Sequence, residues 1–109
     1  MAITSTQVKN SASVMQLAVG SYITSSTAAA FTITTGFKPL WVRVVNETSG
    51  DMYEWYNGMA AAEAVKTVAA GTRSLITSLG ITQNANGFTV GLDTDVNVIN
   101  EQLSWMAIG

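Results

Sequence analysis

The 109-residue chain contains no cysteine and no histidine. It therefore has no disulfide framework, no thiol nucleophile, no imidazole base and none of the usual zinc or haem ligands. Charged residues make up only 11% of the sequence, against about 25% in ordinary soluble domains. Most familiar active sites are excluded by these absences. We expect a protein without enzymatic activity, metal or cofactor.

The sequence also lacks long apolar runs and a basic surplus. No stretch approaches the roughly 18 apolar residues of a membrane-spanning helix, and the N-terminus lacks the basic start and apolar core of a secretion signal. The net charge is −2, with five scattered Lys and Arg residues, so there is no broad positive field for phosphate backbones. We expect no membrane partner, no nucleic-acid partner and synthesis in the cytoplasm.

Hydroxyl and amide side chains replace the missing charges. The chain carries 14 Thr and 10 Ser beside a 48% hydrophobic content. Thr and the other β-branched residues favour strands, whereas Ser, Asn and Gly favour turns. The length is typical of one domain. We predict an all-β, antiparallel single domain, and the pattern alone leaves a sandwich, a jelly roll or a barrel open. The predicted strands cover residues 14–20, 23–34, 41–46, 52–56, 64–69, 73–78, 81–83, 88–90, 96–99 and 102–108, with a short helical turn near 59–63.

The clearest local structure is a hairpin in the middle of the chain. Residues 41–46 alternate as a strand, Ser49-Gly50-Asp51 is a turn signal, and residues 52–56 supply the partner strand. Strand alternation puts Glu54 on the face opposite its aromatic neighbours, beside Arg43 of the partner strand. We predict a cross-strand ion pair between these two residues.

The first 13 residues carry too few apolar side chains for a buried helix or strand. Two interpretations remain open, a frayed terminus and an extended arm that docks on another subunit. We adopt the arm, with residues 1–13 as the arm and 14–109 as the β domain. Ile3 and Val8 are then candidate docking residues.

Two stretches carry a family resemblance, residues 36–46 (GFKPLWVRVVN) and residues 52–59 (MYEWYNGM). They resemble a group of small structural proteins of tailed bacteriophage virions, and residues 66–73, 87–91, 96–98 and 103–107 are similar to later strands of that group. The resemblance implies a jelly-roll-like β-sandwich on the capsid surface. It implies a decoration or cement protein that binds the major capsid protein. It also implies that copies of the chain associate with each other as a trimer or dimer.

Some polar and aromatic residues would allow other chemistry. Asp93, Asp95 and Asn97 have the spacing that begins a calcium loop, but Val98 and Ser104 stand where its glycine and its last ligand belong, so we interpret the acids as turn residues. Glu54 with a second carboxylate would be a glycosidase pair, which needs a cleft that so small a chain hardly encloses. An aromatic platform would make the chain a carbohydrate-binding module. A tail, neck or fibre component of the virion is the other alternative.

The last predicted strand is apolar on both faces, because Leu103, Trp105 and Ala107 alternate with Met106 and Ile108. Such a strand either faces a second subunit or lies inside its own sheet. The candidate residues for self-association or capsid binding are Ile3, Val8, Trp41, Trp55, Trp105, Met106 and Ile108.

Overall fold

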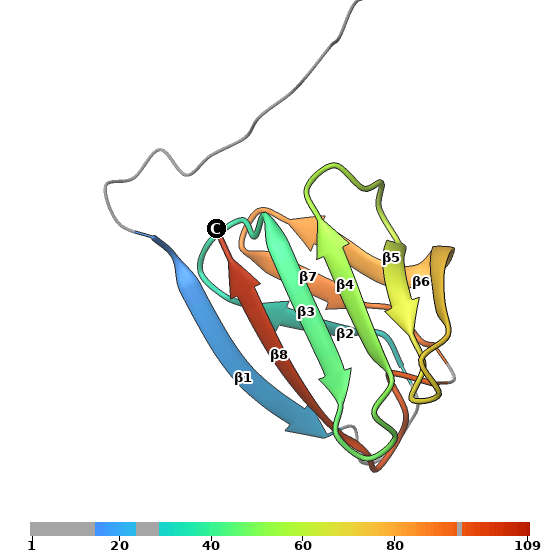
Figure 1. The fold of residues 1–109 in the computed structure, drawn as a ribbon. Helices are drawn as coiled ribbons and strands as arrows, with labels where there is room; N and C mark the ends of the chain where they lie inside the picture. The colour runs from blue at the N-terminus through green and yellow to red at the C-terminus, as the bar shows by residue number, and fades with distance from the viewer. Residues whose placement is uncertain (1–14, 24–28, 94) are drawn as a thin grey trace, which may run out of the picture.

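The computed structural model describes residues 15–23, 29–93 and 95–109. In these ranges the chain is all-β and antiparallel, as predicted, and it contains no helix. The strands are β1 (Leu17–Ile23), β2 (Phe31–Thr34), β3 (Trp41–Asn46), β4 (Met52–Tyr56), β5 (Glu63–Thr67), β6 (Arg73–Asn84), β7 (Gly87–Val90) and β8 (Gln102–Ile108). They form one sheet in the order β1-β8-β3-β4-β5-β6-β7-β2 (Figure 1).

The sheet curls because β6 is long and its two halves pair with different strands. Residues 73–76 pair with β5 and residues 81–84 pair with β7. Between them, Leu79 has a φ of 63°, and a Cβ on Gly80 would lie 2.7 Å from the carbonyl oxygen of Ala62. Only glycine permits this approach of two backbones. The strand bends there and carries β7 and β2 behind β3 and β8 (Figure 1).

The core lies inside this curl. Phe88 of β7 meets Trp105 of β8 edge to face at 5.5 Å between ring centroids. Gly20 of β1 makes room for that indole, because a Cβ there would lie 2.7 Å from the Trp105 ring. The fully or almost fully buried apolar residues are Ile33, Val42, Val44, Tyr53, Trp55, Ala64, Ile81, Phe88, Val90, Val96, Leu103 and Ala107.

The predicted central hairpin is confirmed, since β3 and β4 pair antiparallel with Arg43 opposite Glu54. β1 begins and ends about three residues later than predicted. The strand continues through Gly20, which pairs with Trp105 of β8. Glycine is needed there because a side chain would collide with the Trp105 ring, and not because the chain turns. The predicted break at residues 79–80 is a bend inside one long strand. The structure shows a single curled sheet; residues 1–13, the predicted arm, lie outside the described residues.

Two predicted elements are wrong. Residues 59–62 form a bend and a turn, with Ala62 at a φ of 67°, and no helical turn, and β5 begins at Glu63. Residues 96–99 form a bend and the start of a turn and not a strand, and polar side chains bind the backbone of Val96. Asn46 of β3 donates a hydrogen bond to the carbonyl oxygen of Val96 at 2.9 Å. Within the described ranges, the structure contains no helix that could span a membrane.

Candidate interaction surface

The side of the sheet that faces away from the core presents a broad apolar surface. Directly paired residues of neighbouring strands point to the same side of a sheet, so the registers define three rows across β1, β8, β3, β4, β5 and β6. We call this surface the outer face. Its rows are Leu17-Ile108-Trp41-Tyr56, then Val19-Met106-Arg43-Glu54-Val65-Leu75, then Ser21-Ser104-Val45-Met52-Thr67-Arg73.

Large apolar side chains on the outer face are exposed at both of its ends. Val19 on β1 is 69% exposed, and Leu75 on β6 is 60% exposed. Leu17 and Ile23 on β1 are also more than half exposed. Scattered exposed apolar residues are ordinary, but a contiguous patch marks a surface that contacts another molecule. The outer face carries exposed apolar side chains at both ends and half-buried apolar side chains between them, around a central ion pair.

The charges in the middle of the outer face cancel each other. Arg43 Nη2 lies 3.8 Å from Glu54 Oε1, which confirms the predicted cross-strand pair. The Tyr56 hydroxyl donates a hydrogen bond of 3.0 Å to Glu54 Oε2, and this bond raises the pKa of Tyr56. Glu54 is thus bound by Arg43 of the adjacent strand β3 and by Tyr56 of its own strand β4. It has the arrangement of a structural ion pair, with no second carboxylate in these contacts to make a glycosidase pair.

Three of the predicted interface residues lie on the outer face. Met106 and Ile108 are half-buried in β8. Trp41 stacks on Tyr56, with 6.3 Å between ring centroids and 9° between ring planes. Its indole nitrogen is buried and has no hydrogen-bond partner among the described residues.

The other predicted interface residues lie elsewhere. Trp55 is in the core, 2% exposed, because alternation on β4 turns it inward with Tyr53. Trp105 also points inward, against Phe88. Ile3 and Val8 lie outside the described residues. β8 itself is hydrogen-bonded between β1 and β3, so the C-terminal strand lies inside its own sheet, one of the two arrangements that its apolar faces predicted. Arg43, Val45, Ser104 and Met106 line a shallow hollow above it.

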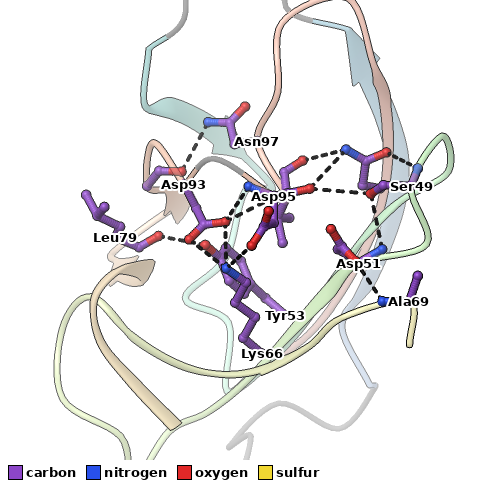
Figure 2. A network of polar contacts seen from close by, with 12 residues as sticks. Ser49, Asp51, Tyr53, Lys66, Ala69, Leu79, Asp93, Asp95 and Asn97 are labelled. Carbon is purple, nitrogen blue, oxygen red and sulfur yellow. Dashed lines mark hydrogen bonds and ion pairs between the residues drawn. The ribbon is translucent and has the colours of Figure 1, made fainter. Parts of the chain in front are cut away.

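A second feature is a cluster of charges formed by Lys66, Asp93 and Asp95 (Figure 2). Lys66 Nζ on β5 lies 2.6 Å from Asp95 Oδ2 and 3.1 Å from each Asp93 carboxylate oxygen. Burial by itself would lower the pKa of Lys66, but the two carboxylates raise it overall. Burial would likewise raise the pKa of Asp93, and its hydrogen bonds from Asp95, Lys66 and Val96 lower it overall. The site is a compact group in which one ammonium group faces two carboxylates, which leaves a net charge of −1 when all three are ionised.

The acids of this cluster serve as turn residues, as predicted. Asp93 Oδ1 accepts hydrogen bonds from the backbone nitrogens of Asp95, at 2.7 Å, and Val96, at 3.2 Å. Asn97 turns to other partners and donates to the carbonyl oxygen of Ala29 at 2.9 Å. The cation that the two carboxylates contact is the Lys66 ammonium group. Sequence reasoning missed Lys66, because a residue 27 positions before Asp93 leaves no spacing signal.

Comparison with protein families, curated proteins and solved structures yields no significant match. The function of the chain is therefore inferred from the outer face and the sequence resemblance.

Proposed function

We propose that this chain is a non-enzymatic structural protein that binds another protein through its outer face. The observation that carries the proposal is the apolar patch spread over six neighbouring strands, with its one central ion pair already satisfied. Strands about 4.8 Å apart and about 3.4 Å per residue give the three rows of this patch a width and height of roughly 25 by 14 Å. That projected area is smaller than one side of a standard protein interface, about 800 Å² per partner, so one copy should bind weakly by itself.

We propose further that the partner is the major capsid protein lattice of a bacteriophage, with this chain as a capsid decoration or cement protein. The support is the resemblance of residues 36–46 and 52–59 to small virion proteins. The curled sheet is compatible with the jelly-roll-like sandwich that this resemblance implies. Many copies on a repeated lattice would bind through avidity, so that a flat apolar face without a deep pocket suffices.

Two alternatives remain beside this proposal. A tail, neck or fibre component would use the same fold and surface at another position in the virion. A carbohydrate-binding module has one observation in its favour, the nearly parallel rings of Trp41 and Tyr56 on the outer face. An electron-microscopy map of the source particle tests the location. Density for this chain on the capsid lattice supports decoration, and density at the tail or neck, or none at all, overturns it.

A charge on the outer face is expected to weaken capsid binding at least about tenfold without unfolding the protein. Leu75→Glu puts a carboxylate on a mostly exposed position, so the thermal midpoint should stay close to that of the original chain. Burying that carboxylate unpaired against the capsid should cost at least about 1.4 kcal/mol, a tenfold loss of affinity. The measurement is co-sedimentation with capsids that lack this protein.

The matched control is Ala85→Glu, an exposed position in the turn between β6 and β7. It adds the same charge away from the outer face, and its binding should match that of the original chain. Equal loss of binding in both variants would indicate general electrostatic repulsion. No loss in Leu75→Glu, with normal folding, would contradict a role for the outer face.

A further inference from the structure

One edge of the sheet has backbone groups that point away from the molecule. Among the described residues, β1 lies at the end of the strand order and pairs with β8 on one side only (Figure 1). The backbone nitrogen of Gly109 donates to the carbonyl oxygen of Gln16 at 2.9 Å, so residue 16 faces β8. Backbone groups alternate in direction along an antiparallel strand. Residues 18, 20 and 22 therefore also face β8, and the N–H and C=O groups of residues 17, 19, 21 and 23 face the open edge.

Within residues 17–23, this edge strand has none of the features that prevent sheet edges from pairing with other strands. Proteins protect such strands with charges, proline, bulges or short length. β1 reads LAVGSYI, seven residues without a charge or a proline. Its register with β8 is continuous, without a bulge. The opposite edge strand, β2, has only four residues. Of the two edge strands, β1 is therefore the one that is better suited to pair with another strand.

We propose that β1 pairs with β1 of a second copy of this chain, antiparallel and across a two-fold axis. Full overlap of two seven-residue strands places the axis at Gly20. Leu17 then lies opposite Ile23 of the second copy, and Val19 opposite Ser21. These four residues are the ones whose backbone groups face the open edge, so each finds a partner in this register. A two-fold interface requires such a self-complementary surface.

The side chains of β1 favour a second copy over a charged partner. The strand is neutral, so it offers no charge for an acidic or basic peptide to match, and two copies do not repel each other. Pairing also joins the two outer faces, because Leu17, Val19 and Ile23 of both copies fall on the same side of the extended sheet. The proposal stands independently of the virion assignment, since it concerns the edge and the capsid proposal concerns the face.

Amide hydrogen exchange followed by NMR tests the pairing with an internal control. In the full chain, the amides of Val19 and Ser21 should become more protected as protein concentration rises. The amides of Ala18 and Tyr22, which face β8, should be equally protected at every concentration. Protection of Val19 and Ser21 that does not depend on concentration would overturn the proposal, because it would place a segment of the same chain, or nothing, on this edge.

Substitutions separate edge pairing from stacking of outer faces. Ser21→Pro removes a backbone N–H that faces the open edge and leaves the bonds to β8 intact. Sedimentation should show a dimer for the original chain and a monomer for Ser21→Pro. Val19→Lys, a charge at the same edge, should also give a monomer, and it serves where Ser21→Pro does not fold. Leu75→Lys, on the outer face but far from β1, should remain a dimer. A dimer that Leu75→Lys dissociates, or one that survives in both β1 variants, overturns the proposal.

Cross-linking tests the register. The chain has no cysteine, so introduced thiols are unique. Mixing Val19→Cys protein with Ser21→Cys protein under mild oxidation should give a disulfide-linked dimer that contains one of each, since these residues lie directly opposite. Thr32→Cys, exposed on β2, replaces Val19→Cys in the control mixture. Equal cross-linking in the two mixtures would overturn the register. Normal capsid binding by a strictly monomeric chain would leave the proposed function standing and this proposal refuted.

Discussion

Replacing Trp55 with alanine is expected to cost about 3–5 kcal/mol of unfolding free energy, the usual range for a buried tryptophan. The indole is 2% exposed and packs in the core beside Tyr53. Its nitrogen also donates to the carbonyl oxygen of Ala60 at 3.4 Å. The total free energy of unfolding of a small domain is only about 5–15 kcal/mol. The variant should therefore be largely destabilised, with a urea midpoint far below that of the original chain.

The other two tryptophans are the matched comparison. Trp105→Ala should also cost several kcal/mol, because the ring fills the space between Gly20 and Phe88. Trp41→Ala should lower the unfolding free energy least of the three, because the Trp41 ring lies half-buried on the outer face. Urea unfolding of the three variants gives the order. A loss for Trp41→Ala equal to that for Trp55→Ala would contradict the assignment of the two sides of the sheet.

Replacing Lys66 with methionine is expected to destabilise the protein by about 3–5 kcal/mol at neutral pH, as in other buried pairs that lose one partner. The Lys66 and Asp93 side chains are 13% and 11% exposed, so the substitution leaves a buried carboxylate without its cation. Arg43→Met is the control. It breaks an ion pair of 3.8 Å on the outer face, where such pairs contribute about 0–1 kcal/mol.

The effect of Lys66→Met should depend on pH in a defined direction. The folded protein holds the pKa of Asp93 below its usual 3.8, so the stability from ionised Asp93 is present above that value and lost as pH falls through the folded pKa. The pKa of Lys66 is raised above 10.5, so its contribution is lost only as pH rises through that higher value. In Lys66→Met, burial without a cation favours protonated Asp93. The difference in unfolding free energy between the variant and the original chain should therefore shrink as pH falls through the raised pKa of Asp93 in the variant and on toward its lower pKa in the original chain. Urea unfolding at pH 7 and pH 3 tests this, and a gap that is equal at both pH values would contradict it.

Local pattern was sufficient for the strand class and for the central hairpin. The turn at residues 49–51 brings two strands together whose partners are neighbours in the chain. Arg43 and Glu54 follow from alternation and register alone. The faces of β8 followed in the same way, with Leu103 and Ala107 buried inward and Met106 and Ile108 on the outer face. Short-range pairing leaves a periodic signal that sequence reasoning can read.

Long-range contacts left no such signal. β1 pairs with β8 about 80 residues further along the chain, and Lys66 meets acids 27 and 29 positions away. Gly20 was interpreted as the end of a strand, yet it lies in the middle of one because Trp105 needs the space above it. Trp55 was a candidate interface residue by composition and became a core residue by packing.

The sequence by itself therefore determined that this chain is all-β, that residues 41–56 form a hairpin with an ion pair across it, and that its last strand is apolar on both sides. Only the tertiary structure decided the order of the strands, the bend at Gly80 that curls the sheet, the apolar outer face and the open edge at β1. The physical reason is that alternation and turn residues act between neighbours in the chain. Strand order and packing are set by which distant surfaces can be buried together, and this depends on all strands at once.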